Sequence, residues 1–289
     1  MSSAPGCPRS PAAPDPRRPG GAAPLPVASR WHPRRTCAAG RRPAARPPDG
    51  RGEGTITGER FGGPGGRDRT GTTVTGASPD TSGRALSWTY CEEFVPEDEH
   101  QLRARELALE LDLPTILPGA GSVLRLLAAS LQARSVVEIG TGTGIGALWL
   151  LGGMPDDGVL TTIDPEAALQ RAAKQILTAA DVRPSRLRAI AGRPADVLPR
   201  LADGAYDLVL VAGDVHGYPL AVEEGVRLLR PGGVLAVDAA LAHDRVANPA
   251  RRDELTTLVR DVGRTVRDDE RLLPALLPSG DGLLLGVRR

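Results

Sequence analysis

A strand, a glycine-rich loop and the start of a helix are encoded by Val136-Val137-Glu138-Ile139-Gly140-Thr141-Gly142-Thr143-Gly144-Ile145-Gly146. The apolar residues of its first part are β-branched and do not alternate with polar ones, which is typical of a buried parallel strand. Glycine at every second position lets the backbone turn sharply and approach a ligand where a Cβ would collide. The apolar run 147–151 then begins a helix, whose N-terminal amides and dipole face that ligand. This pattern predicts a nucleotide-binding site.

Length and composition limit the class of protein. The 289 residues are enough for one α/β domain with an extension, and a net charge of +1 gives no global argument for binding nucleic acid or a membrane. The cysteines at 7, 37 and 91 lack metal-site or CxxC spacing and predict no disulfide framework. No apolar run approaches the roughly 20 residues of a membrane span. We therefore expect a cytoplasmic protein.

The chain divides into two unequal parts. Residues 1–84 are dominated by Pro, Gly, Ala and Arg and are predicted to be disordered, because they carry too little apolar surface to offset the loss of chain entropy. Their arginines suggest a tail for nucleic acid, but no aromatic residues interleave them as a single-strand binder would require. We expect a segment without function there, and one folded domain over residues 85–289.

The folded part alternates helix and strand patterns. Helices are expected at 97–113, 121–132, 144–152, 166–179, 219–229 and 251–264, and strands at 135–139, 159–163, 187–191, 207–212, 233–238, 272–277 and 283–287. Repeated β-α units predict a doubly wound, mostly parallel α/β sheet of seven strands with helices on both faces. The short turn before the last strand predicts that this strand is antiparallel.

The type of nucleotide depends on the residues around the loop. Gly142 to Ala147 match the G-x-G-x-x-A pattern of dinucleotide sites, so an NAD(P)-binding oxidoreductase is one alternative. Asp164, at the end of the second strand, can accept ribose hydroxyl groups in either case. Glu138 favours another ligand, because a carboxylate at this strand end repels a pyrophosphate and attracts an ammonium group. S-adenosylmethionine carries an ammonium group and no phosphate.

Together with the Pro231-Gly232-Gly233 turn and the closing hairpin, these segments resemble class I S-adenosylmethionine-dependent methyltransferases. The nearest resemblance is to small-molecule O-methyltransferases of the catechol and caffeoyl-CoA type and their actinobacterial relatives, and it extends over residues 90–289. It implies a Rossmann-like domain, a homodimer, and a cofactor site made of Ile116, Glu138, Gly140, Thr141, Gly142, Gly146, Asp164 and Pro165. By the same resemblance, Asp164 would hold the ribose and Pro165 would flank the adenine.

The metal site of the resembled family is not retained. That family commonly binds a divalent metal through an Asp-Ala-Asp-Lys segment after the fourth strand and an Asp-Asn pair after the fifth. Here the segments read Ala212-Gly213-Asp214-Val215 and Asp238-Ala239, so only Asp238 remains of the implied ligands. One carboxylate does not make a Mg²⁺ site, and we expect no metal.

Methyl transfer then depends on positioning and on removing the proton of the acceptor. Candidate bases at the carboxyl ends of strands, where such sheets bind ligands, are Asp214, His216, Asp238 and His243. We take the first three as the catalytic candidates: imidazole suits a base near neutral pH, and Asp214 directly follows a strand. Asp214 could equally cap the helix that follows it.

The sequence therefore predicts an S-adenosylmethionine-dependent O-methyltransferase that acts on a small-molecule hydroxyl group without a metal. We expect no membrane partner and no nucleic acid. One alternative is a methyltransferase-fold protein that binds the cofactor without catalysis, as the missing metal ligands suggest. An NAD(P) oxidoreductase and a nucleic-acid-modifying enzyme guided by the basic tail are further alternatives.

Overall fold

The structure is a computed structural model, and it describes residues 81–289. Residues 1–84 were predicted to be disordered, and residues 1–80 of that segment lie outside the described residues. Helix α1 spans Thr81–Glu93, so residues 81–84, which were expected to be disordered, are helical. The sequence did not reveal this helix because nearly all of its described side chains are exposed, which leaves no apolar stripe at helical spacing.

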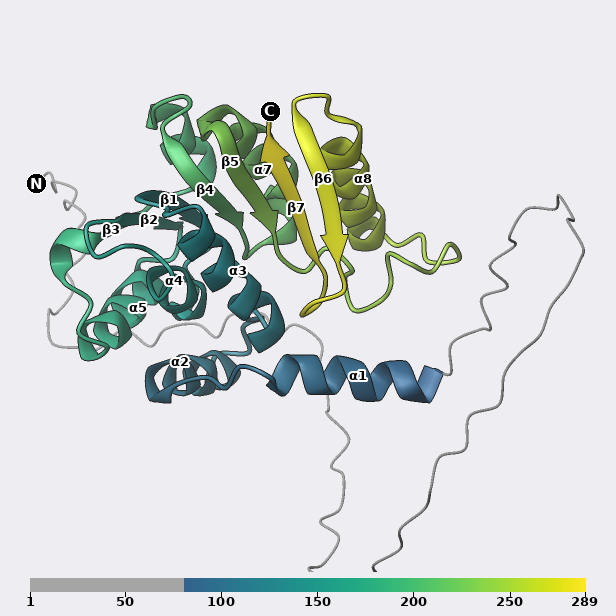
Figure 1. The fold of residues 1–289 in the computed structure, drawn as a ribbon, viewed down its shortest axis with the longest axis horizontal. Coiled ribbons are helices and arrows are strands. Elements are labelled where there is room, and N and C mark those ends of the chain that lie inside the picture. Colours follow the sequence, from purple (N-terminus) through teal and green to yellow (C-terminus); the bar gives the residue numbers. More distant parts are fainter. Residues whose placement is uncertain (1–80) are drawn as a thin grey trace, which may run out of the picture. The chain divides into compact units, whose positions relative to one another are not determined.

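One sheet of seven strands lies at the centre of the described region, in the order β3-β2-β1-β4-β5-β7-β6 (Figure 1). The strands are β1 (Ser135–Ile139), β2 (Val159–Asp164), β3 (Leu187–Ala191), β4 (Tyr206–Val211), β5 (Leu229–Val237), β6 (Leu272–Leu277) and β7 (Leu283–Arg288). β1 to β5 pair in parallel, whereas β7 pairs antiparallel with both β5 and β6. The predicted α/β fold with an antiparallel last strand is confirmed.

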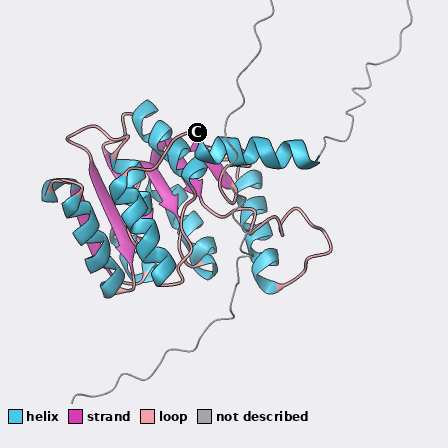
Figure 2. Ribbon diagram, turned by 90° about the horizontal axis from the view of Figure 1, so that it is seen from below, coloured by secondary structure: helices cyan, strands magenta, loops and turns pink. Residues whose placement is uncertain are grey.

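Helices cover both faces of this sheet (Figures 1 and 2). One face packs against α2 (Glu99–Glu110), α3 (Pro118–Ser130), α4 (Ile145–Leu151) and α5 (Ala167–Ala179). The other packs against α7 (Tyr218–Leu228), α8 (Glu254–Asp268) and the short α6 (Pro194–Val197). Single 3₁₀ turns occur at Pro184–Arg186, Leu198–Arg200 and Val215–Gly217. None of the helices in this part of the chain has the length and apolar character needed to cross a lipid bilayer.

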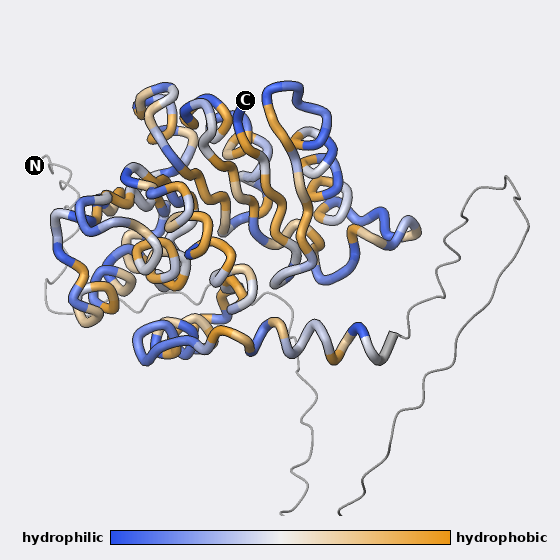
Figure 3. The backbone as a smooth tube through the Cα atoms, in the orientation of Figure 1, coloured by the Kyte–Doolittle hydropathy of each residue, from blue (hydrophilic) through white to orange (hydrophobic). Residues whose placement is uncertain are grey.

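Successive strand residues fill two apolar layers, one on each face of the sheet. Val136 and Leu208 belong to the layer under α3 and α4, and their chain neighbours Val137 and Val209 to the layer under α7 and α8. Figure 3 shows the strands as a largely hydrophobic centre. Because both faces are covered, strand residues have no polar face to present, which explains the unbroken apolar runs in the sequence. The packed sheet holds the carboxyl ends of β1, β4 and β5 at one edge.

The β6–β7 turn reaches that same edge. β6 runs in the direction of the parallel strands and ends at Leu277, so residues 278–282 lie beside the loops that leave β4 and β5 (Figure 1). Backbone hydrogen bonds fix this contact, since the amides of Ala240 and Leu241 donate to the carbonyl groups of Gly282 and Asp281, at 2.9 and 2.8 Å. The terminal hairpin is therefore part of the edge at which such sheets bind ligands.

One buried carboxylate attaches α1 to the rest of the domain. Glu92 accepts hydrogen bonds from the amides of Gly119, at the start of α3, and Gly280, in the β6–β7 turn, at 2.8 and 2.7 Å. Gly119 is required there, because a Cβ would come within 2.7 Å of the Glu92 carboxyl carbon. Glu92 thus joins three segments that are distant in the sequence.

Candidate active site

A cavity of about 480 Å³ opens at the carboxyl edge of the central strands. Its walls come from the glycine loop after β1, the loops after β4 and β5, residues 113–117 ahead of α3, and the β6–β7 turn. Of the residues predicted to bind a cofactor or act in catalysis, those that line it are Ile116, Glu138, Gly140, Thr141, Gly142, Gly146 and Asp238. The glycine loop and the segment before α3 therefore meet at one site.

Two glycines of the loop, Gly140 and Gly146, lie where an added side chain would collide with its surroundings. Gly140 has φ +95°, and a Cβ there would come within 2.5 Å of the Ala212 carbonyl oxygen of the neighbouring loop. A Cβ on Gly146 would collide with the Glu138 carboxylate and come within 2.9 Å of Ile116 Cδ1. The missing side chains thus allow two loops and a buried carboxylate to share one small volume.

Glu138 ends a chain of buried hydrogen bonds. Gln170 Nε2 donates to Thr141 Oγ1 at 2.7 Å, the hydroxyls of Thr141 and Thr162 lie 2.6 Å apart, and Thr162 Oγ1 donates to Glu138 Oε2 at 2.6 Å. The two ends of this chain determine which atom donates in each hydrogen bond, because Gln170 Nε2 can only donate and a carboxylate oxygen accepts. Thr162 is also the direct strand neighbour of Glu138. The network holds the carboxylate at the cavity wall.

The surroundings of Glu138 oppose its negative charge. The residue is 1% exposed, and burial raises its pKa to about 8, with a smaller contribution from the charge of Asp164. The hydrogen bond from Thr162 acts in the opposite direction. A cation bound in the cavity would favour the charged form of this carboxylate.

Asp164 and Pro165 lie behind the glycine loop and outside the lining of the cavity. The Asp164 carboxylate accepts hydrogen bonds from the amides of Gly142, at 3.1 Å, and Glu166, at 2.9 Å. Pro165 is exposed. Asp164 is thus connected to the cavity through Gly142, which lines it.

Asp238 lies inside the cavity wall at the end of β5, 8% exposed. Burial raises its pKa to about 7, and the charges of Asp281 and Glu92 contribute to this increase. Tyr218, which is 2% exposed, also lines the cavity, and burial followed by the charge of Asp238 raises its pKa. This part of the cavity therefore combines acidic groups with a phenol.

Asp214 and His216 do not reach the cavity. Both side chains are exposed and bind each other, with Asp214 Oδ1 3.0 Å from His216 Nδ1 and 3.1 Å from the His216 amide. That hydrogen bond raises the pKa of His216. Asp214 caps the 3₁₀ turn that precedes α7, which matches the capping alternative raised from the sequence. The turn directs the pair outward, while its other residue Val215 lines the cavity.

The structure brings three titratable residues into the cavity that were not among the predicted site residues: Tyr218, Arg245 and Asp281. Arg245 follows β5, and Asp281 lies in the β6–β7 turn. No motif marks them, because their positions depend on how the terminal hairpin returns to the edge. His243, which the sequence offered only as one of several bases, also lines the cavity.

Among residues 81–289, no group of at least three His, Cys, Asp or Glu side chains is arranged to hold an ion. At the two positions where the resembled family carries further ligands, Ala212 and Ala239 line the cavity with methyl groups.

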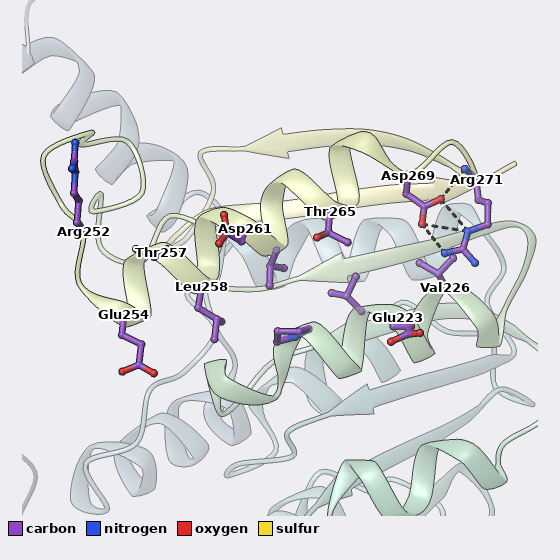
Figure 4. A pocket seen from close by; sticks show the side chains of 13 residues that line it. Glu223, Val226, Arg252, Glu254, Thr257, Leu258, Asp261, Thr265, Asp269 and Arg271 are labelled. Carbon is purple, nitrogen blue, oxygen red and sulfur yellow. Dashed lines mark hydrogen bonds and ion pairs between the residues drawn. The ribbon is translucent and has the colours of Figure 1, made fainter.

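A second hollow, of about 770 Å³, lies between α7 and α8 and shares no lining residue with the first (Figure 4). Its floor is apolar, formed by residues such as Val226 and Leu258, and its rim carries charged groups. At one end Asp269 and Arg271 bind each other, with oxygen to nitrogen distances down to 2.7 Å. Nothing in this hollow resembles the glycine cradle of the first, which remains the candidate active site.

Comparison with known proteins identifies the family to which the chain belongs. A family model described as O-methyltransferase matches residues 96–289. A protein of Mycobacterium ulcerans (strain Agy99), provisionally named an O-methyltransferase, is 46% identical over 220 residues, covering 74% of this chain and 98% of that protein. A relative from Mycolicibacterium smegmatis with the same provisional name is 48% identical over 200 residues, covering 69% of this chain and 95% of the relative.

Solved structures of other proteins also resemble this chain. A Corynebacterium glutamicum protein matches with a TM-score of 0.66 and 34% identity, covering 72% of this chain and 97% of that chain. The O-methyltransferase TomG from Streptomyces achromogenes, involved in tomaymycin synthesis and crystallised with S-adenosylmethionine, matches with a TM-score of 0.63 and 28% identity, covering 71% and 96%. The chain belongs to the O-methyltransferase family. The resemblance inferred from the glycine loop is thereby confirmed.

Proposed function

We propose that the protein is an S-adenosylmethionine-dependent O-methyltransferase that acts on the hydroxyl group of a small molecule. The observation that carries this proposal is Glu138, a buried carboxylate held at the cavity wall beside the glycine loop. Burial and a neighbouring negative charge destabilise its charged form, so a cationic ligand group bound at this point would stabilise the carboxylate and lower its pKa. The ammonium group of S-adenosylmethionine has that chemistry.

The residues of the cavity fit this cofactor. Gly146 has no Cβ that would displace the Glu138 carboxylate from the cavity wall, and Gly142, at φ +51°, has nothing within 4 Å of an added Cβ. The buried Thr143 Oγ1 lines the cavity and has no hydrogen-bond partner among the described residues, which a polar ligand could supply. The cavity volume also lies in the range of about 300–1,000 Å³ that is usual for small-molecule sites.

The chain's own residues have limited tasks in this reaction. When bound, the cofactor supplies an electrophilic methyl group on a sulfonium sulfur. Glu138 would hold the ammonium group, and Asp164, which already holds the Gly142 amide, would take the ribose. The loops after β4 and β5 would shape the acceptor pocket around Asp238 and Tyr218. What remains is to orient the acceptor and remove its proton.

We further propose that the reaction needs no metal at the position used by the resembled family. The alanines at 212 and 239 support this, because neither side chain has a donor atom. Turnover should therefore be unchanged after treatment with EDTA and gel filtration. A loss of turnover that Mg²⁺ restores would contradict the proposal.

The function is tested by binding and turnover together. Calorimetry should detect S-adenosylmethionine and S-adenosylhomocysteine but not NADPH. Formation of S-adenosylhomocysteine is then followed over a panel of phenols and hydroxyquinones. Binding without turnover on any acceptor would favour the alternative of a cofactor-binding protein without catalysis.

We also propose a homodimer, formed in part through α1. This helix and the residue that follows it expose large apolar side chains, with Leu86 73%, Tyr90 69% and Phe94 69% exposed, although the helix is held to the domain by Glu92. A second copy of the chain would cover this surface. Analytical ultracentrifugation should give twice the chain mass, and the double variant Tyr90→Arg/Phe94→Arg should sediment as a monomer. A monomeric wild-type protein would contradict this.

A cytoplasmic location belongs to the same proposal. It is supported by the cysteine usage of the chain and by the free, exposed thiol of Cys91. Fractionation of cells that express the tagged protein would test it.

A further inference from the structure

The cavity contains a histidine that is held by a carboxylate from a distant part of the chain. His243 Nδ1 lies 3.4 Å from Asp281 Oδ2, and the His243 amide donates to Asp281 Oδ1 at 2.6 Å. Both residues line the cavity, from the loop after β5 and from the β6–β7 turn. The Asp281 side chain is 16% exposed and that of His243 is 70% exposed. Asp281 thus fixes the backbone of His243 by a hydrogen bond and lies within ion-pair distance of its imidazole at the cavity wall.

The backbone around His243 is unusual in a way that supports this arrangement. Ala242, His243 and Asp244 have φ values of +47°, +55° and +62°, a run of left-handed residues without glycine. Such a conformation is unfavourable for residues other than glycine, and it persists only where the surroundings enforce it. Here Asp281 enforces it through its side chain on the His243 amide and its carbonyl oxygen on the Leu241 amide. The three consecutive left-handed residues present His243 to the cavity.

We propose that His243 is the general base that removes the proton of the acceptor hydroxyl, and that Asp281 is its positioning residue. This inference rests on the proposed function and names the base of that same site. Nδ1 faces Asp281, so Nε2 is the nitrogen that takes the proton. The family pattern does not supply this pair, and the sequence-level candidates Asp214 and His216 lie outside the cavity.

The step balances in atoms and charge. The hydroxyl proton of the acceptor moves to Nε2 of His243, while the hydroxyl oxygen forms a bond to the methyl carbon. The bond between that carbon and sulfur breaks, and its electron pair stays on sulfur, which becomes a neutral thioether. The positive charge of the sulfonium is replaced by that of the imidazolium, which the Asp281 carboxylate stabilises until the proton leaves to solvent.

The chain offers a matched control, because His216 and Asp214 form the same kind of pair outside the cavity, with the ring and amide of the histidine both bound to the carboxylate. His243→Gln should lower kcat at least about 100-fold, the lower end of what a general base contributes. H216Q should retain the wild-type kcat. Calorimetry with S-adenosylhomocysteine should give affinities within about twofold of wild type for both variants, which shows that the fold and cofactor site are intact.

The positioning role of Asp281 is tested by comparing the effects of single and double variants of Asp281 and His243 on kcat. Asp281→Asn keeps an oxygen for the His243 amide but removes the charge, so kcat should fall while the KM for the acceptor changes little. The double variant H243Q/D281N should be no slower than H243Q, because a positioning residue has no effect without the group that it positions. Additive losses would assign Asp281 a separate role and overturn this part of the inference.

The pH profile gives an independent readout. The titratable or charged groups around His243 are Asp281, Asp244, Arg245, Asp238 and Tyr218. The wild-type kcat should decrease at acid pH as the base becomes protonated, and this acid limb should disappear in H243Q. Equal kcat values for H243Q and wild type overturn the inference while leaving the proposed function in place. A wild-type protein that methylates no acceptor overturns both.

Discussion

The raised pKa of Glu138 predicts how the affinity for the cofactor changes with pH, and over which pH range. Its pKa of about 8 in the free protein must decrease when an ammonium group binds, so binding releases a proton. The affinity for S-adenosylmethionine should therefore increase with pH between 5.5 and 7.5, by up to about tenfold per pH unit. Calorimetry across this range tests the expectation. The Glu138→Gln variant should bind more weakly and without this pH dependence; a wild-type profile that is equally flat would contradict the assigned role.

We expect that replacing Gly146 even with alanine disturbs the site. In Gly146→Ala the new methyl group would collide with the Glu138 carboxylate and approach Ile116. We expect a loss of stability of about 1–3 kcal/mol, typical of an overpacked core, together with a loss of cofactor binding.

The control for this substitution is Gly263→Ala in α8, where an added Cβ meets nothing within 4 Å. Alanine should stabilise that helix by about 0.5–1 kcal/mol. Urea unfolding of both variants measures the two effects. A Gly146→Ala protein as stable as wild type, with unchanged binding, would show that the loop can move away from the carboxylate.

Local residues of the site could be predicted from the sequence, and remote ones could not. Glu138 and the loop glycines follow directly from one strand–loop–helix segment. Tyr218 and Asp281 reach the cavity from elements far along the chain, so their positions depend on the closed sheet. Asp214 was expected to face the site because it follows β4, but the 3₁₀ turn that it caps directs it outward.

Among the elements, α1 is joined to α3 and to the β6–β7 turn by the buried carboxylate of Glu92. Glu92→Ala would remove the acceptor of the Gly119 and Gly280 amides and leave both buried without a partner. A buried unsatisfied group costs about 1–3 kcal/mol, so the free energy of unfolding should fall by a few kcal/mol. The adjacent and exposed Glu93 provides the control, since Glu93→Ala should change stability by less than about 0.5 kcal/mol. Equal effects in the two variants would refute the role given to Glu92.

The strongly periodic elements were predictable, and the exceptions have physical causes. Buried strands such as β1 and β4 match the predicted ranges closely because their composition leaves little choice. β5 begins at Leu229 and includes the Pro231–Gly233 segment, which the sequence presents as a turn. The register with β4 shifts between Tyr206 and Leu208, so an irregular pairing accommodates residues that usually interrupt a strand.

At the scale of the domain, two buried carboxyl groups link stability to pH. Glu138 titrates at about 8 and Asp238 at about 7, against ordinary values of 4.5 and 3.8. Because both pKa values are raised by folding, the folded state binds more protons than the unfolded one, and their contribution is complete below the ordinary values. The free energy of unfolding of the free protein should fall by a few kcal/mol per group as the pH rises from about 4 to 8.

Urea unfolding at several pH values between 4.5 and 8.5 measures this dependence. The double variant E138Q/D238N, whose side chains do not titrate, should show a much flatter profile. A wild-type protein that becomes more stable as the pH rises through this range would be incompatible with the burial of these groups.

The position of β7 has a consequence for how the protein is made. β7 lies between β5 and β6, although it is synthesised after both, and β6 pairs with no other strand. While the chain is still emerging from the ribosome, β6 therefore has no template, and the turn that carries Asp281 and Gly280 has no fixed place. The cavity is assembled last, after the strands that form most of it. A premature stop codon that removes β7, Leu283–Arg288, should therefore prevent assembly of the cavity and leave β5 with an open, aggregation-prone edge.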